Sequence, residues 1–191
     1  YLAMYYNEAP KLYLRVNKLA TTKHKLIAYF AKKNIIVNET PACPNMLISD
    51  QAAQILNDVT FDEGYFTIQD ISAAMVIDLL HPEENENILD LFAGRGGKAG
   101  YIAELLNNTG EVVAVDKIPN KIKEMKQTLE RLQVNNVKLI TEDAFKFGPV
   151  APAYDKVLID VPCSGWGVFQ KKAELRWQSK QNIQELLKIQ E

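Results

Sequence analysis

The sequence predicts a doubly wound α/β domain with a mainly parallel sheet, preceded by a small basic α+β subdomain. Three observations predict it: four short apolar runs typical of buried strands, helical periodicity between them, and basic residues concentrated near the start of the chain. The chain has 191 residues, of which 47% are hydrophobic and 24% charged, as in an ordinary globular protein. It has no apolar run near the roughly 18 residues of a membrane span, and two cysteines cannot form a disulfide framework. We therefore exclude a membrane protein and a secreted disulfide scaffold.

Residues 1–62 are expected to form the small basic subdomain. Between Lys11 and Lys33 the chain has seven basic residues and no acidic one. They are Lys11, Arg15, Lys18, Lys23, Lys25, Lys32 and Lys33. Such a run is typical of a solvated helix face, but it also suits a surface that follows the phosphates of RNA. Because a run rich in turn residues, TPACPNM, follows, and then the acidic Asp62, we place the domain boundary between residues 62 and 63.

Residues from 63 to 191 alternate between strand and helix patterns. The expected strands are Ile88–Phe92, Val112–Val115, Val137–Ile140 and Val157–Ile159. Apolar residues at helical spacing fill Ala99–Leu106 and Ile122–Leu132, and Pro119 suits the first turn of the second helix. Strand–helix–strand units of this length predict right-handed crossovers and a parallel sheet. An earlier apolar stretch, Ile71–Leu80, is expected to be a buried helix that packs on this sheet.

Ligands of an open parallel sheet bind beyond the carboxyl ends of its strands. The first predicted strand is followed there by a glycine-rich turn, Ala93–Lys98, which leads into a helix. Asp116, Asp143 and Asp160 come at or just after the ends of the next three strands. A single Asp at a strand end often only caps a helix. Three in succession beside a glycine turn indicate one crevice for a ligand with several hydroxyl and amino groups.

The glycine turn alone is a weak signal. Gly94, Gly96 and Ala99 match the dinucleotide pattern, and Asp116 stands where a ribose-binding acid would, so an NAD-dependent oxidoreductase is one hypothesis. A nucleotide triphosphate loop fits poorly, because Ala99 stands where that motif has Ser or Thr. A turn with no ligand is the plain alternative. The glycines let backbone N–H groups approach an anion, either a pyrophosphate or the carboxylate of an amino-acid-like cofactor.

The end of the fourth strand distinguishes these hypotheses. Residues 160–167 read Asp-Val-Pro-Cys-Ser-Gly-Trp-Gly. Pro162 makes the turn stiff, and Gly165 lets a planar ligand approach the backbone. A dehydrogenase has no use for a thiol here. A lone cysteine is usually a small buried hydrophobe, but Cys163 follows an Asp at the active edge of the sheet, which favours a functional thiol.

Five segments together resemble the Sun-type (NOP/Sun) RNA cytosine-5 methyltransferases, which use S-adenosylmethionine. The stretch ending in Arg15-Val16-Asn17 is similar to the RVN signature of the family's RNA-binding subdomain, and Gly64–Asp70 to the motif at the start of its catalytic domain. Leu89–Lys98 is similar to the family's DLCAAPGGK loop, and Asp160–Gly167 to its DAPCSGTG motif. Arg176-Trp177 falls where the family has a basic residue and Trp. The resemblance covers most of the chain and implies a Rossmann-like methyltransferase fold.

The loop departs from the family's pattern at three positions. Phe92, Gly94 and Arg95 differ from the family's residues, and Trp166 replaces Thr in the cysteine motif. Arg95 stands in place of a proline, which changes the stiffness of the loop.

The resemblance also implies roles for individual residues. Asp160 would contact both the cytosine edge and the cofactor, and Cys163 would assist release of the methylated product rather than attack the base. The methionine part of the cofactor would be held by Phe92, Ala93, Gly94, Arg95, Gly96, Gly97 and Lys98. Asp116 would bind the ribose hydroxyls and Asp143 the adenine amino group. Lys98 fits equally well as a solvated residue at the start of a helix.

In the family the attacking cysteine lies in a Thr-Cys motif beyond the position that corresponds to Glu191. The chain starts without Met and stops within a helix-like run, so we expect a C-terminally truncated fragment that is inactive by itself. The expected substrate is RNA, with bacterial ribosomal RNA favoured, and we expect a cytoplasmic monomer without metal or membrane contact. An NAD-dependent oxidoreductase and a non-catalytic RNA-binding module remain the alternatives.

Overall fold

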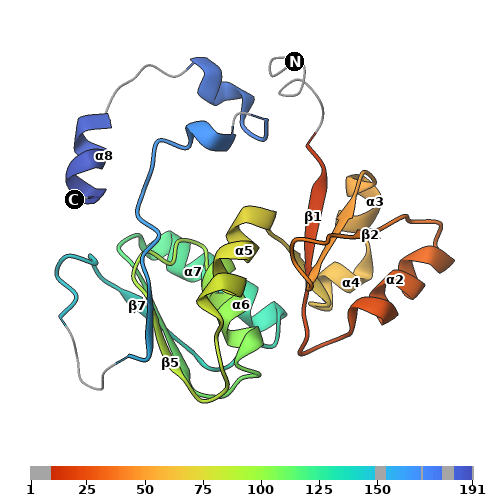
Figure 1. Cartoon of the computed structure of the whole chain (residues 1–191), viewed down its shortest axis with the longest axis horizontal. Coiled ribbons are helices and arrows are strands. Elements are labelled where there is room, and N and C mark those ends of the chain that lie inside the picture. The colour runs from red at the N-terminus through yellow and green to blue at the C-terminus, as the bar shows by residue number, and fades with distance from the viewer. Residues whose placement is uncertain (1–9, 149–153, 169, 178–182, 191) are drawn as a thin grey trace. The chain divides into compact units, whose positions relative to one another are not determined.

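The computed structural model describes residues 10–148, 154–168, 170–177 and 183–190 (Figure 1). The chain divides into two compact units. Leu12–Asp160 form the larger one, and the other contains the residues from Val161 on together with the segment before Leu12.

The larger unit begins with a four-stranded antiparallel sheet. Its strands are β1 (Leu12–Val16), β2 (Asn38–Glu39), β3 (Met46–Ser49) and β4 (Phe66–Ile68), in the order β2-β3-β1-β4. The helices that accompany it are α2 (Lys23–Lys32), α3 (Ala52–Leu56) and α4 (Val59–Asp62). Leu26 and Phe30 of α2 pack against Leu14 and Phe66 of the sheet in one apolar core. The last strand, β4, lies beyond residue 62, so this sheet reaches past the boundary expected from composition.

A four-stranded parallel sheet follows. Its strands are β5 (Asn87–Asp90), β6 (Glu111–Asp116), β7 (Val137–Thr141) and β8 (Lys156–Leu158), in the order β7-β6-β5-β8. The predicted parallel sheet and Rossmann-like arrangement are confirmed. The first strand ends at Asp90, two residues before its predicted end at Phe92, because the chain already turns into the glycine loop.

Three helices accompany this sheet: α5 (Ile71–Leu80), α6 (Gly97–Leu105) and α7 (Pro119–Arg131). They share one core with Ile88, Val112 and Ala114, and α5 and α6 lie next to each other (Figure 1). The alternate residues of β5 and β6 point to the opposite face, where Phe147 and Tyr154 of the β7–β8 connection cover them. The chain therefore changes face between β7 and β8, which makes the gap between β5 and β8 the switch point where such sheets bind ligands.

The helix predicted at Ile71–Leu80 has those bounds, but it is only partly buried. Ala74 and Ile77 are buried in the core, whereas Met75 and Leu79 are exposed. The helix therefore packs on the core of the sheet as expected, but through one face only.

The expectation that the whole basic run forms an RNA-facing surface is wrong for Arg15. This side chain is completely buried, as is Asn17 two residues later. The amide of Asn17 donates to the carbonyl oxygens of Gly64 and Leu132, each at 2.8 Å. The RVN segment thus links β1 to the region of the parallel sheet. The exposed basic residues of the run are Lys11, Lys18, Lys25, Lys32 and Lys33.

The second unit contains three short helical segments. They are the 3₁₀ helices η1 (Trp166–Val168) and η2 (Ala173–Trp177) and the helix α8 (Ile183–Gln190). The side-chain amide of Gln190 donates to the carbonyl oxygen of Pro162 at 2.9 Å. Within the described part of the chain, neither unit contains a helix long and apolar enough to span a membrane.

Candidate active site

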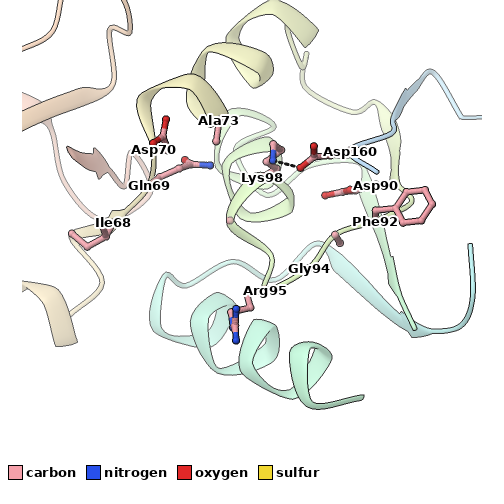
Figure 2. Close-up of a pocket in the computed structure, with 12 residues that line it drawn as sticks. Ile68, Gln69, Asp70, Ala73, Asp90, Phe92, Gly94, Arg95, Lys98 and Asp160 are labelled. Carbon is pink, nitrogen blue, oxygen red and sulfur yellow. Dashed lines mark hydrogen bonds and ion pairs between the residues drawn. The ribbon is translucent and has the colours of Figure 1, made fainter. Parts of the chain in front are cut away.

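A pocket of about 330 Å³ lies at the carboxyl ends of β5 and β8, at the switch point of the parallel sheet (Figure 2). Its volume is within the range of small-molecule sites. It is lined by Ile68, Gln69, Asp70, Ala73, Asp90, Phe92, Ala93, Gly94, Arg95, Gly97, Lys98 and Asp160. The wall therefore combines the end of β4, the start of α5, the glycine loop and the residues that follow β8.

The glycine loop connects β5 to α6 through two residues with positive φ. Gly94 has φ of 60° and Gly96, which precedes the first residue of α6, has φ of 80°. This backbone conformation favours glycine. Asp116 at the end of β6 holds the loop, because its carboxylate accepts from the N–H of Gly94 at 3.0 Å and from that of Ile118 at 2.9 Å. The loop is thus held in place by its backbone.

Asp90, the last residue of β5, presents a buried carboxylate to the pocket (Figure 2). Among the described residues, neither carboxylate oxygen meets a hydrogen-bond donor in good geometry. Burial raises the pKa of Asp90 to about 7, with Asp160 acting in the same direction and Lys98 against it. A cationic ligand group beside this carboxyl would favour its charged form and thereby offset the cost of burial.

The two cations in the pocket wall are already paired. Lys98 donates to the carboxylate of Asp160 at 2.5 Å, which links the first turn of α6 to the end of β8 (Figure 2). Arg95 turns away and pairs with Glu124 of α7. Lys98 is therefore not simply a solvated residue, and Arg95 ties the loop to α7 at the position where the resembled family has proline.

A buried network attaches β1 to the same loop. Arg15 donates through Nη1 to Oε1 of Gln69 and to the carbonyl oxygen of Gly97, both at 2.6 Å. Its Nη2 donates to Oε1 of Glu104 in α6 at 2.7 Å. Burial raises the pKa of Glu104, and the guanidinium of Arg15 opposes this rise. The guanidinium also lies over the ring of Tyr101, 4.9 Å from its centroid.

Most of the predicted cofactor residues meet at this pocket. Phe92, Ala93, Gly94, Arg95, Gly97, Lys98 and Asp160 line it. Gly96 instead faces Met125 of α7, since a Cβ at this glycine would lie 2.3 Å from Cγ of Met125. Asp116 supports the loop rather than forming the wall, and Oδ1 of Asp143 accepts from the N–H of Phe145 at 3.2 Å. Cys163 belongs to the other compact unit and is exposed.

Five residues of the pocket wall have no role predicted from the sequence. They are Ile68, Gln69, Asp70, Ala73 and Asp90. Asp90 had a recognisable signal, since an acidic residue inside an apolar strand of a parallel sheet is rarely buried without a purpose. Gln69 and Asp70 had been noted only as part of a family motif, because no spacing rule relates the end of an antiparallel strand to a distant glycine loop.

Comparison with known proteins shows which family the chain resembles. The family model described as 16S rRNA methyltransferase RsmB/F matches residues 77–191. A probable ribosomal RNA small subunit methyltransferase B from Synechocystis sp. is 33% identical over 194 residues, which cover 100% of this chain and 44% of that protein. A tRNA (cytosine(72)-C(5))-methyltransferase from Pyrococcus horikoshii is 40% identical over 116 residues, which cover 61% of this chain and 30% of that protein.

A solved structure gives the same picture of the fold. The crystal structure of a methyltransferase homolog protein from Pyrococcus horikoshii has a TM-score of 0.78 and 28% identity, and the match covers 90% of this chain and 56% of that one. The chain thus spans less than half the length of the two relatives named above. The match of the family model over more than half of the chain supports one conclusion: the chain belongs to the 16S rRNA methyltransferase RsmB/F family.

Proposed function

We propose that the protein containing this chain methylates carbon-5 of a cytosine in RNA, with S-adenosylmethionine as methyl donor and ribosomal RNA as substrate. The observation that carries the proposal is the buried carboxylate of Asp90, which faces the pocket at the switch point. The names of the relatives, which are RNA and cytosine-C5 methyltransferases, support the reaction type. The ribosomal RNA named for the relative from Synechocystis sp. also supports a cytoplasmic location.

The residues of the pocket fit the amino-acid end of this cofactor. The α-ammonium of a methionyl group supplies the cation that the Asp90 carboxylate lacks. Backbone N–H groups at the start of α6, next to Gly97, suit the α-carboxylate. Oδ2 of Asp116 already accepts from the N–H of Gly94 and from Lys121, but Oδ1 accepts only from the N–H of Ile118 and has room for a further donor, such as a ribose hydroxyl. Asp143 keeps its expected role near the adenine.

The same wall argues against NAD. A dinucleotide brings a pyrophosphate with two negative charges to the glycine loop. Asp90 and Asp160 lie in the wall, while Lys98 and Arg95 already have acidic partners. The negative charges of these two carboxylates oppose binding of the negatively charged pyrophosphate.

When bound, the cofactor supplies an electrophilic methyl group on its sulfonium. Carbon-5 of cytosine is too weak a nucleophile to take this group directly, so a thiolate first adds at carbon-6 and makes carbon-5 nucleophilic. After transfer, a base removes the carbon-5 proton and the thiol leaves. In our proposal Asp160 contacts the cytosine edge, and Cys163 assists the release step. Cys163 is three residues after Asp160, a chain length that spans at most about 11 Å.

The target base must leave its stack to reach these groups, which costs a few kcal/mol and least in a loop of a structured RNA. We propose that Lys18, Lys25 and Lys32 contribute phosphate contacts, since these side chains are exposed on the part of the chain with the most basic residues. Lys23 and Lys33 contribute less, because they pair with Glu39 and Asp58.

The test is transfer of labelled methyl groups from S-adenosylmethionine to ribosomal RNA by the protein that contains this chain, with 5-methylcytosine as the product identified by mass spectrometry. Asp160→Asn should reduce transfer by at least tenfold, because it removes the charge that contacts Lys98 and the base. Labelled product at a base other than cytosine, or reduction of NAD without methyl transfer, would refute the proposal.

A further inference from the structure

The side-chain amide of Gln69 has one end bonded and one end open. Its Oε1 accepts from Nη1 of Arg15 at 2.6 Å, and only 7% of the residue is exposed. Its Nε2 has no hydrogen-bond partner among the described residues. Because a guanidinium has donors only, it requires the amide oxygen to face it, so the orientation of the amide follows from chemistry. The NH₂ group is therefore the end that faces the pocket, as Figure 2 shows.

The open NH₂ group faces the first turn of α6. A Cβ built on Gly97 would lie 3.7 Å from Nε2 of Gln69. The first backbone N–H groups of this helix lack acceptors within the helix, as at every helix start. Donors from the end of β4 and from the start of α6 thus converge on one region of the pocket. A buried amide donor that converges with the free N–H groups of a helix start, without an acceptor among the described residues, indicates an anionic ligand group.

Asp90 in the same pocket has the opposite requirement. Its buried carboxylate needs a cation, whereas the NH₂ of Gln69 needs an acceptor. An α-amino acid carries one group of each kind on a single carbon. Lys98 does not compete for the anionic group, because it is paired with Asp160 at 2.5 Å.

We propose that Gln69 binds the α-carboxylate of the methionyl part of S-adenosylmethionine, and that Arg15 is the positioning residue that turns the Gln69 amide toward it. This inference rests on the proposed function. Arg15 also donates to the carbonyl oxygen of Gly97 at 2.6 Å. One guanidinium therefore contacts both Gln69 and the first turn of α6, and fixes the position of one relative to the other. The affinity for the cofactor consequently depends on β1, a strand of the antiparallel sheet.

Two ligands distinguish binding of the α-carboxylate by Gln69 from a merely structural role of this residue. S-adenosylmethionine carries the carboxylate, and decarboxylated S-adenosylmethionine keeps the amine, the sulfonium and the nucleoside but lacks it. Gln69→Glu is the sharpest variant, because it keeps the size of the side chain and its bond to Arg15 but presents an oxygen to the ligand. Gln69→Met removes the amide without adding charge, and Arg15→Lys keeps the charge beside Glu104 but not the planar fork.

The experiment is calorimetric titration of the chain and the three variants with both ligands. We expect S-adenosylmethionine to bind about 10- to 100-fold more weakly to Gln69→Glu and about 10-fold more weakly to Gln69→Met and Arg15→Lys. The affinity for the decarboxylated ligand should change less than about threefold in all of them. A merely structural role would weaken both ligands equally.

The outcomes distinguish the two proposals. If the unmodified chain binds neither ligand, the cofactor assignment itself is refuted. If it binds S-adenosylmethionine and the variants lose both ligands equally, or lose neither, the role of Gln69 and Arg15 is refuted while the cofactor assignment stands. Selective loss of the carboxylate-bearing ligand supports the inference.

Discussion

Arg15 of β1 and Glu104 of α6 form a hydrogen-bonded ion pair at 2.7 Å, with both side chains completely buried. The pair connects the antiparallel sheet to the helix that begins at the glycine loop. Two buried charges gain little net stability from each other, but either one alone carries a large desolvation cost. Through this pair, the stability of the antiparallel sheet and the stability of α6 depend on each other. Arg15 is buried in the pair and is therefore not part of an RNA-facing surface.

Replacement of Arg15 by Met should lower the free energy of unfolding by about 3–5 kcal/mol at neutral pH, because Glu104 is left buried without its partner. Arg15→Met/Glu104→Met should recover most of this loss. Urea unfolding of the two single variants and the double variant measures the coupling. Additive losses would show that the ion pair does not link the two residues energetically.

Asp90 should make the unliganded chain less stable as the pH rises. Burial raises its pKa to about 7 from an ordinary value of 3.8, so the folded chain holds a proton that the unfolded chain has lost between these values. The free energy of unfolding should fall as the pH rises from about 4 to 7 and then level off. The total change should be roughly 4 kcal/mol, since each pKa unit between 3.8 and about 7 corresponds to about 1.4 kcal/mol.

The matched variant is Asp90→Asn, which has the same shape and no charge. Its stability relative to the unmodified chain should increase over this pH range and be constant above it, as measured by urea unfolding at pH 4, 6 and 8. Parallel pH profiles for the two proteins would mean that Asp90 is not held at a raised pKa.

The two glycines of the loop with positive φ should differ in their tolerance of a side chain. Gly96→Ala should cost several kcal/mol, because the conformation is strained and the new Cβ would lie 2.3 Å from Cγ of Met125. Gly94→Ala should cost about 1–2 kcal/mol, since its nearest neighbour, the carbonyl oxygen of Phe92, is 4.0 Å away. Thermal unfolding compares them, and an equal loss in both would contradict the packing argument.

Replacement of Cys163 by Ala should cause a covalent protein–RNA complex to accumulate if this thiol assists product release. The complex is expected in the protein that also carries the attacking Thr-Cys motif, and is detected as a labelled RNA that remains bound in denaturing gels. Cys43→Ala is the control, because Cys43 is buried and burial raises its pKa to about 11, which keeps it a thiol. If Cys163→Ala instead abolishes the complex, Cys163 is the attacking residue.

Short-range patterns in the sequence predicted the parallel sheet well. Strand and helix periods are local, so Val137–Ile140 and Ile71–Leu80 were found with nearly correct bounds. The roles of residues before Asp70 are harder to predict from the sequence. The role of Arg15 depends on contacts with Gln69 and Glu104, which are 54 and 89 positions away. A basic residue in a basic run is normally solvated, and nothing local marks the exception.

The residues of the pocket can be predicted only in part from the sequence. The glycine loop and Asp160 follow strands of one parallel sheet, and the rule for carboxyl ends of strands brings them together. Gln69 comes from the end of a strand in the other sheet, where that rule does not apply. Gln69 is therefore recognisable only from its unpaired buried amide in three dimensions, whereas Asp90 also stands out in the sequence as an acidic residue of an apolar strand.

The most direct test of the central claim is parallel calorimetric titration of this chain with S-adenosylmethionine and with NAD. We expect saturable one-to-one binding of S-adenosylmethionine, lost in Asp90→Leu, and no heat from NAD at the same concentrations. Saturable binding of NAD together with no binding of S-adenosylmethionine would contradict it.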